Sequence, residues 1–409
     1  MSVGRAPQKA ATIWNKNFIC VVISNLMLCF AHFSINPLVA SYMKYLGAGA
    51  QLTGFLAGMF FAVAFLMHPF AGPAMTKIDK RKLLVFVFAI GSIASFGYAL
   101  FPNIPAFIVF RFLSGVQYSM VGGLIMTLAA DHLPEERLAY GLGIYGIGGA
   151  FGTALAPAIG IGLLDYGTQV KGEGFGFTLA FLFAAVTLAL AIIPALVLDP
   201  DRKTKEEVAS TGAWYKNIFT IHALSSTILI FLVQIPFSML NTYMVEFGKT
   251  QGIAGISVFF TVFAVVLAGT RPMSGFLTDR FGVNKVMYPA LALFAASLVL
   301  VGVSSSLTTI LIAAICAAVG FGSSQPSIQA MSMKVEPPLR RGVASNTIYM
   351  GFDLGLFAGP FIGGFIYEKH GYPTMFITGA VPIVIAMICF AVTLPGYFRR
   401  IRQLESPEK

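Results

Sequence analysis

An aspartate inside an apolar run, Asp353, is the residue of this sequence best suited to carry a proton. It lies in Met350-Gly-Phe-Asp-Leu-Gly355, about ten residues after the run begins at Val343, and no other carboxylate falls near the middle of such a run. A carboxylate in hydrocarbon is costly and usually has a function, because burial disfavours its charged form. We therefore expect Asp353 to bind a proton on one side of a membrane and release it on the other. The alternative is a structural carboxylate that is hydrogen-bonded to a neighbouring helix.

A polar segment, residues 271–285, separates two long apolar runs and repeats an earlier part of the chain. Subtraction of 203 from its numbering places His68-Pro69 opposite Arg271-Pro272, and the same offset aligns Gly160 with Gly363. Duplication of a whole chain is characteristic of repeat proteins and of membrane transporters. We expect the polar segment itself to form a short hairpin loop.

The composition places the chain in a membrane. Hydrophobic residues make up 57% of the sequence and charged residues only 11%, and the mean hydropathy is +0.80. A soluble globule would need far more polar surface. The net charge of +10 is spread over short loops and forms no basic stripe, which argues against nucleic acid as a partner. The four cysteines lie inside apolar runs, where they supply neither a disulfide framework nor metal-ligand spacing.

Twelve apolar runs are long enough to cross a bilayer, which needs about 20 residues per helix. The spans are expected at 18–43, 52–73, 83–101, 105–129, 140–164, 177–198, 219–245, 253–276, 286–303, 308–333, 343–367 and 373–394. The predicted fold is an all-α integral membrane protein whose twelve transmembrane helices form two pseudo-symmetric six-helix bundles. The bundles comprise residues 1–198 and 216–409, and residues 199–215 form a charged linker between them.

The distribution of Lys and Arg predicts the orientation of these spans. The loops on the side of both termini contain 21 of these residues, and the loops on the other side contain 4. By the positive-inside rule, both termini and the linker are expected in the cytosol, with the protein in the cell inner (plasma) membrane. We expect it to act as a monomer in the lipid bilayer.

The sequence lacks the patterns of a nucleotide-driven or metal-dependent enzyme. It contains neither a Gly-x-x-x-x-Gly-Lys-[Ser/Thr] phosphate loop nor a His-Glu-x-x-His zinc motif. Gly141, Gly143 and Gly146 match the dinucleotide fingerprint by letters, but no strand precedes them. We predict no enzymatic activity, no cofactor and no metal, so that the energy for any work must come from an ion gradient.

The polar segment carries a family resemblance. Its Gly275-Phe-Leu-Thr-Asp279-Arg280-Phe-Gly282-Val-Asn-Lys285 resembles motif A, a loop signature of the major facilitator superfamily. The twin of this motif in the first half begins at Gly72 but has Thr76 in place of the acid. The resemblance implies that the carboxylate of Asp279 latches the two bundles at a helix N-terminus, held by Arg280 and Lys285, and that Thr76 cannot. The alternative is a basic turn that serves topology alone.

Two further motifs resemble those of the same family. Arg111, in Phe110-Arg-Phe-Leu-Ser-Gly115, resembles motif B, although an arginine at this depth could also extend to the lipid headgroups. Two glycine-rich segments resemble motif C, which the family associates with antiporters; they contain Gly152, Pro157 and Gly160 in the first half and Gly355, Gly359, Pro360 and Gly363 in the second. Small residues four apart also allow two helices to pack closely, so antiport is an inference added to packing.

The resemblance implies a central cavity lined by spans one, four, seven and ten. The polar residues of these spans are Asn25, His32, Asn36, Arg111, Gln117, Tyr118, Gln234, Asn241, Tyr243, Gln325 and Gln329. Amides and aromatic residues suit a modest-sized, partly apolar small molecule. Related antiporters often carry an acid in span one; this chain has His32 there, which makes His32 a second candidate for proton coupling.

These observations favour a secondary transporter that exports a small organic or drug-like compound in exchange for protons by alternating access. Proton-coupled uptake of an organic anion or a sugar, with Arg111 as counter-ion, is the alternative. A receptor or an integral enzyme has little support, because the sequence offers neither a soluble domain nor a catalytic constellation. The sequence does not identify the substrate.

Overall fold

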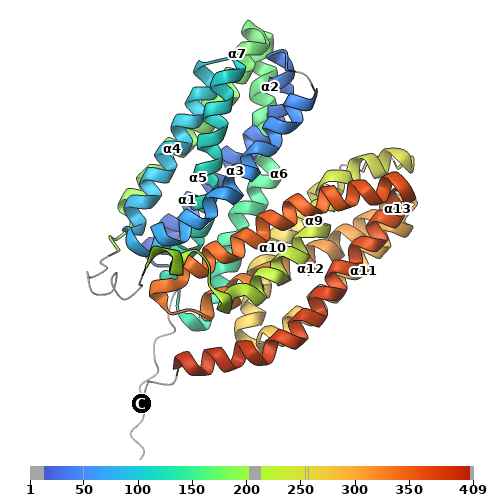
Figure 1. Ribbon diagram of the computed structural model, residues 1–409. Coiled ribbons are helices and arrows are strands. Elements are labelled where there is room, and N and C mark those ends of the chain that lie inside the picture. The colour runs from blue at the N-terminus through green and yellow to red at the C-terminus, as the bar shows by residue number, and fades with distance from the viewer. Residues whose placement is uncertain (1–12, 49, 202–212, 254, 257, 406–409) are drawn as a thin grey trace, which may run out of the picture.

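The computed structural model describes residues 13–48, 50–201, 213–253, 255–256 and 258–405. All regular secondary structure in these ranges is helical (Figure 1). The first half consists of α1 (Lys16–Ile35), η1 (Asn36–Leu38), α2 (Val39–Tyr45), α3 (Ala50–Lys77), α4 (Lys80–Leu100), α5 (Ile104–Asp131), η2 (Glu135–Arg137), α6 (Leu138–Lys171) and α7 (Glu173–Val197). The second half consists of η3 (Trp214–Asn217), η4 (Ile221–Ala223), α9 (Leu224–Thr250), α10 (Val258–Phe281), α11 (Val283–Val303), α12 (Leu307–Lys334), η5 (Pro338–Arg340) and α13 (Arg341–Glu405).

These helices account for the twelve predicted spans. Eleven helical stretches within the described residues are long and apolar enough to cross a membrane. The last of them contains two spans, because α13 reverses its direction at Gly371, where φ is +80°. The first span is also interrupted, since Pro37 lies in the 3₁₀ turn η1 between α1 and α2. The fold class predicted from the sequence is therefore confirmed.

Side-chain caps fix the N-termini of several helices close to the starts of the predicted apolar runs. The side-chain oxygens of Asn15 and Asn103 each accept a hydrogen bond from a backbone N–H of the first turn, at 2.9 Å, to begin α1 and α5. Ser306 does the same for α12 at 3.3 Å. Such caps satisfy N–H groups that a helix cannot pair internally, and they fix where each span begins.

The predicted loop at 271–285 is wrong in its extent. Residues 271–281 continue the helix α10, and only Gly282, with φ of +86°, separates α10 from α11. A positive φ ends a helix at glycine without strain, so the polar residues before it remain in the last turns of the helix. Arg271 consequently lies inside the protein, where its side chain is 8% exposed.

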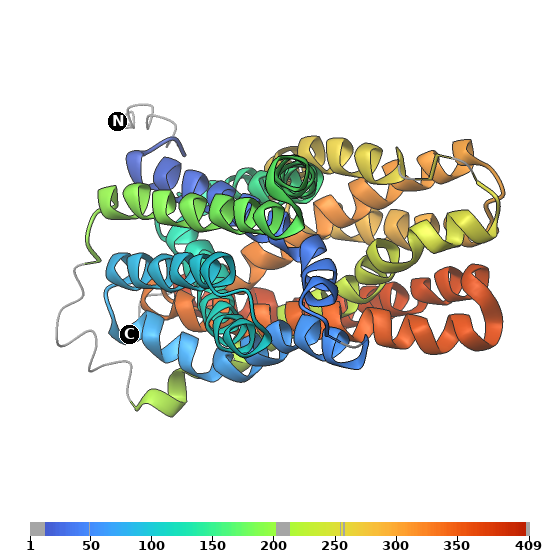
Figure 2. The same cartoon turned by 90° about the horizontal axis from the view of Figure 1, so that it is seen from above.

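The two halves form separate bundles that diverge from one end (Figure 1). The end at which α1 begins and α13 finishes is called the terminal end below. In the perpendicular view, the second half (yellow to red) extends past the first on the side away from both labelled termini (Figure 2). Across the bundles, α10 packs on α6 and α13 packs on α3 and α5.

The linker predicted at 199–215 lies partly outside the described residues, since 202–212 are among those not described. Its first residue, Asp199, is tied to the start of α1. The carboxylate of Asp199 accepts a hydrogen bond from Asn17 Nδ2 at 2.9 Å and one from Lys16 Nζ at 3.2 Å. These two bonds lower the pKa of the Asp199 carboxyl. The end of α7 is thereby held beside α1.

The glycine-rich segments pack helices within each bundle. In α6, a Cβ at Gly160 would overlap the backbone carbonyl oxygen of Ser34 in α1. In α13, a Cβ at Gly359 would overlap Ser238 Oγ and the carbonyl oxygen of Ile235 in α9. Both glycines are therefore required by close contact of two backbones, which is the structural meaning of the small-residue spacing.

Candidate substrate cavity and inter-bundle contacts

A cavity of about 820 Å³ lies between the two bundles. Helices α1, α3, α5 and α6 line it from the first bundle, and α9, α10, α12 and α13 line it from the second. Its wall is largely apolar and contains nine phenylalanines among the described residues: Phe33, Phe60, Phe61, Phe151, Phe237, Phe260, Phe263, Phe321 and Phe352. A wall of this kind with a few polar groups is typical of a site for a small, partly apolar molecule.

Seven of the predicted cavity residues line this space. They are Asn25, His32, Asn36, Tyr118, Asn241, Gln325 and Gln329. The Asn25 amide donates to the carbonyl oxygen of Tyr145 in α6 at 2.8 Å, and the His32 ring stacks on Tyr118 with 4.9 Å between centroids. Nε2 of His32 is buried and has no hydrogen-bond partner.

Two predicted cavity residues, Gln234 and Tyr243, do not line it. Gln234 is fully buried against Gly355 of α13. Tyr243 donates its hydroxyl to the carbonyl oxygen of Pro360 at 2.6 Å. Both residues lie on the face of α9 that packs against the glycine-rich face of α13, so they contribute to the bundle interior and the prediction for them is wrong.

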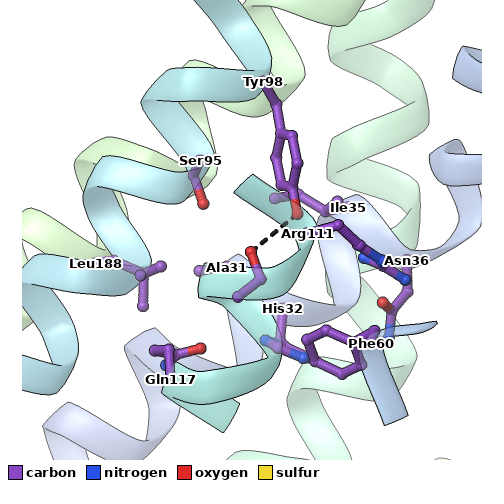
Figure 3. Close-up of a pocket in the computed structure, with 12 residues that line it drawn as sticks. Ala31, His32, Ile35, Asn36, Phe60, Ser95, Tyr98, Arg111, Gln117 and Leu188 are labelled. Atoms are coloured by element: carbon purple, nitrogen blue, oxygen red, sulfur yellow. Dashed lines mark hydrogen bonds between the residues drawn. The ribbon is translucent and has the colours of Figure 1, made fainter. Parts of the chain in front are cut away.

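Arg111 and Gln117 line a different and much smaller cavity of about 20 Å³, together with His32, Asn36 and Tyr98 (Figure 3). Nε of Arg111 donates to the carbonyl oxygen of Leu56 at 3.2 Å, and its guanidinium lies 4.7 Å from the ring centroid of Phe60. The residue is only 4% exposed, so it does not extend to the headgroups. A space of this size holds about one water molecule and no organic ligand. Neither residue therefore lines the substrate-sized cavity.

Arg271 lines the main cavity, although the sequence placed it in a loop. Its Nη1 donates to the carbonyl oxygen of Gly146 in α6 of the opposite bundle, and its Nη2 donates to Oε1 of Gln325 at 2.7 Å. Its Nε is buried without a hydrogen-bond partner. The signal that could have found it was the repeat, because the offset of 203 pairs Arg271 with His68, a second costly side chain in an apolar run.

His68 joins the bundles at the corresponding junction of α3 with α13. Its Nε2 lies 2.8 Å from Oδ2 of Asp353, and its Nδ1 lies 3.0 Å from Oδ1 of Asn346. His68 is 1% and Asp353 3% exposed, and Oδ1 of Asp353 has no hydrogen-bond partner. Asp353 does not line the cavity itself, but its neighbour Phe352 does. The sequence singled out Asp353 and missed His68 and Asn346.

The directions of these hydrogen bonds determine where protons lie. Nδ2 of Asn346 donates to the carbonyl oxygens of His68 (2.9 Å) and Ile218 (3.2 Å), so the amide oxygen of Asn346 faces the imidazole as an acceptor. Nδ1 of His68 must therefore carry a proton. The contact between Nε2 and Asp353 then needs a second proton, on either the imidazole or the carboxyl, because two lone pairs would otherwise face each other. The observed arrangement therefore fits a pair that shares two protons.

Asp279 closes the terminal end between α10 and α6. Its two carboxylate oxygens accept from the backbone N–H groups of Ala139 (3.2 Å) and Tyr140 (2.8 Å), at the start of α6. A carboxylate at this position is stabilised by unpaired N–H groups and by the helix dipole. Arg280 lies at the same helix end, with its guanidinium 5.3 Å from the Phe281 ring centroid. No ion pair of Arg280 or Lys285 occurs among the described residues.

The corresponding contact between α3 and α13 is built differently. Thr76 donates to the carbonyl oxygen of Pro73 in its own helix. The bundles are joined instead by Arg341 at the start of α13, whose Nη2 donates to Oε1 of Glu135 at 3.0 Å and whose Nη1 donates to the carbonyl oxygen of Ala130 at 3.3 Å. Nearby, Gly72 allows α3 to approach the carbonyl oxygen of Asn217, which a Cβ would overlap.

The described helices thus form two six-helix bundles around a central cavity, with contacts that join the bundles at one end. The sequence model of the Major Facilitator Superfamily matches residues 21–259 and 223–408. The chain therefore belongs to this superfamily of transporters, and it is not an enzyme.

Several characterised transporters are similar over nearly the whole chain. The Staphylopine export protein of Staphylococcus aureus is 21% identical, over 93% of this chain and 96% of that protein. Multi-drug resistance efflux pump PmrA of Streptococcus pneumoniae is 24% identical over 92% and 95%, and Multidrug resistance protein MdtG of Salmonella choleraesuis is 25% identical over 92% and 94%.

Solved structures show the same fold. The human organic anion transporter MFSD10 aligns with a TM-score of 0.75 at 15% identity, covering 91% of this chain and 98% of that one. FucP in its outward conformation aligns with the same TM-score and identity, covering 92% and 98%.

Proposed function

We propose that this protein exports a small organic compound in exchange for protons. The observation that carries the proposal is the buried contact of His68 with Asp353, which joins the two bundles and has the geometry of a proton site. Export is supported by the names of the similar proteins, which are an export protein and two resistance proteins.

The proton at this junction links protonation to the movement of the bundles. With the proton present, a donor and an acceptor meet at 2.8 Å across the bundles. Without it, the lone pair of Nε2 faces a carboxylate, and the contact changes from attraction to repulsion. Proton loss therefore favours separation of α3 from α13, and proton binding favours their closure. An antiporter needs this coupling, because the proton must travel with one of the two movements.

Asp353 is the better proton site than His32. Asp353 lies in a contact between the bundles, so its protonation changes with their separation. His32 lies within the first bundle, stacked on Tyr118 and close to Phe60. Its protonation would introduce a charge without an acidic partner, since the described ion pairs contain none with His32. We assign the transported proton to the His68–Asp353 pair.

The direction of transport is tested in proteoliposomes with one acidic and one alkaline compartment. A panel of labelled drug-like compounds is first screened by counterflow, and the compounds that exchange are then given a pH gradient. Antiport concentrates a compound on the acidic side, whereas the alternative, proton-coupled uptake of an organic anion or sugar, concentrates it on the alkaline side. Accumulation on the alkaline side would overturn export by proton exchange.

The orientation in the membrane is part of the same proposal. A cytosolic location of the terminal end is supported by the excess of Lys and Arg in its loops, according to the positive-inside rule. A membrane-impermeant thiol reagent applied to intact cells should react with Lys171→Cys and Lys369→Cys and should not react with Arg81→Cys. Reaction of Arg81→Cys from outside would reverse the orientation.

A further inference from the structure

The cavity contains one fixed positive charge among its described lining residues, and this charge has no counter-ion. Arg271 lines the cavity and is 8% exposed. None of the described residues that line the cavity is Asp, Glu or Lys. The hydrogen-bond partners of its guanidinium are the carbonyl oxygen of Gly146 and the amide oxygen of Gln325, both neutral. A guanidinium held in this way lacks the anion that usually accompanies a buried cation.

The guanidinium also has unused hydrogen-bond capacity. A guanidinium has five N–H donors in a planar fork, and two of them are taken by Gly146 and Gln325. Nε of Arg271 is buried and has no partner in the structure. A carboxylate matches this geometry, because its two oxygens can accept two parallel N–H bonds from one guanidinium.

The surroundings of Arg271 suit an organic body attached to such a carboxylate. Gln329 lines the same wall as Gln325 and supplies a second amide. Most of the remaining lining is apolar, and it includes the stacked rings of Phe237 and Phe321, whose centroids lie 4.0 Å apart. The volume of about 820 Å³ exceeds what an inorganic anion needs. The site therefore fits an aromatic or otherwise apolar molecule with one acidic end.

The other buried arginine of the spans does not offer such a site. Arg111 stacks on Phe60, donates to a carbonyl oxygen and lines only the cavity of about 20 Å³ (Figure 3). Of these two arginines, only Arg271 lines a cavity large enough to hold an organic anion.

We infer that Arg271 is a carboxylate-binding subsite and that the transported compound is a small amphipathic carboxylic acid in its ionised form. This inference rests on the proposed function in that it names the substrate class of the same cavity. The binding of the acid does not depend on which way the gradient drives it.

The test uses the full-length protein and matched probes. Three aromatic scaffolds, naphthalene, indole and biphenyl, are each supplied as the acetate, its methyl ester and the corresponding ethylamine. Binding to the purified protein is measured by scintillation proximity with labelled probes. The variants are Arg271→Gln and Arg271→Lys, and the matched control is Lys171→Gln, an exposed cation at the opposite end of α6 from the latch.

The expected result is a preference of at least about tenfold for the acid over its ester and amine on one or more scaffolds, which corresponds to about 1.4 kcal/mol. Arg271→Gln should lose the preference, and Lys171→Gln should keep it. If Arg271→Gln does not fold, Arg271→Lys decides: it keeps the charge but not the fork, so its affinity for the acid should fall at least threefold while its affinity for the ester is unchanged.

Two results would overturn the inference: wild-type protein that prefers no acid on any scaffold, or an acid preference that survives in Arg271→Gln or is unaltered in Arg271→Lys. Different results would contradict the proposed function. Acids that bind and undergo counterflow but do not accumulate under a pH gradient would remove proton exchange and leave the subsite in place. Gradient-driven export of amines alone would remove the subsite and leave proton exchange in place.

Discussion

The two junctions between the bundles occupy equivalent positions in the internal repeat, yet they hold different chemistry. At the junction of α3 with α13, His68 meets Asp353 and Asn346. At the junction of α6 with α10, Arg271 occupies the position equivalent to His68 and meets a backbone carbonyl and Gln325. The residue that the offset of 203 places opposite Asp353 is Ala150, so the second junction has no acid.

This difference indicates that the two junctions have different functions. A guanidinium stays charged and donates hydrogen bonds at every pH that the protein meets, so the junction of Arg271 does not respond to protons. An imidazole against a carboxylate changes from attraction to repulsion with the loss of one proton. One copy of the repeat is therefore suited to bind an anionic solute and the other to bind a proton.

The terminal ends of the same junctions differ as well. Asp279 accepts from two backbone N–H groups of α6, whereas the other side uses the long side chain of Arg341 to reach Glu135. Glu135 is largely exposed, with 74% of its side chain accessible. Asp279 is half-buried, whereas Glu135 is largely exposed and only its partner Arg341 is buried. Loss of the first should therefore have the larger effect.

The largest effect on transport is expected from a substitution that gives both junctions an arginine. His68→Arg would place a permanent donor against Asp353, so the contact would persist when the proton leaves. Because separating a buried ion pair costs about 3 to 5 kcal/mol, transport should fall by more than about a hundredfold while the protein still binds ligand from the side opposite the terminal end. Counterflow and ligand binding measure the two effects, and His370→Gln, at an exposed histidine that does not line the cavity, is the control. Transport at the wild-type rate in His68→Arg would show that this junction does not open.

Loss of the acid separates proton movement from bundle movement. Asp353→Asn keeps the size of the side chain but cannot become a carboxylate. The interaction with His68 therefore no longer changes from attraction to repulsion when a proton leaves. Transport driven by a pH gradient should fall to the background level, and exchange of labelled for unlabelled substrate should continue at a rate within about threefold of wild type. Gradient-driven transport that survives in Asp353→Asn and disappears in His32→Ala would place the proton site in the first bundle.

A smaller effect is expected at the latch of Asp279. Asp279→Asn removes a charge-assisted contact worth about 1.5 to 3 kcal/mol, which shifts the balance of the two states by about tenfold or more. Transport should slow, whereas the affinity of the closed-latch form for its ligand should be almost unchanged. Rate and affinity are measured on the same preparation. An unaltered transport rate in Asp279→Asn would mean that this segment is no latch and that it determines only the membrane topology.

The smallest effect is expected at Glu135. Glu135→Gln weakens a single exposed contact with Arg341, which is screened by salt and worth less than about 1 kcal/mol. The transport rate should change by no more than about threefold at physiological ionic strength. A fall in transport rate as large as that of Asp279→Asn would mean that the contacts of Glu135 and Asp279 contribute equally to transport, contrary to the difference described above.

The elements of this fold could be predicted from the sequence because a bilayer fixes the length of a span. The amides of α1 and α12 could also be placed, since polar side chains in an apolar helix avoid lipid. The rotation of α9 could not, because its lipid-facing and protein-facing residues are similarly apolar, and Gln234 and Tyr243 were assigned to the wrong face. Arg271 was missed because polar residues before a glycine resemble a loop, although α10 continues through them.

The position of His68 in the repeat could be seen in the sequence, but its partners could not. Its position in the repeat matched Arg271, and both are costly in an apolar run. Each of them, however, has a partner on a helix of the opposite bundle, more than 100 residues away in the chain: Asp353 for His68 and Gly146 for Arg271. Only the packing of the two bundles brings them together.

We expect the His68–Asp353 pair to take up a proton, whereas the junction of Arg271 has Ala150 in the position equivalent to Asp353 and therefore takes up none. Infrared difference spectra of the purified protein, recorded on acidification, report the carbonyl band of a newly protonated carboxyl. This band should be present in wild-type protein and in Arg271→Gln, absent in Asp353→Asn, and shifted in His68→Gln because its hydrogen-bond partner has changed. The same band in Asp353→Asn as in wild type would contradict the account.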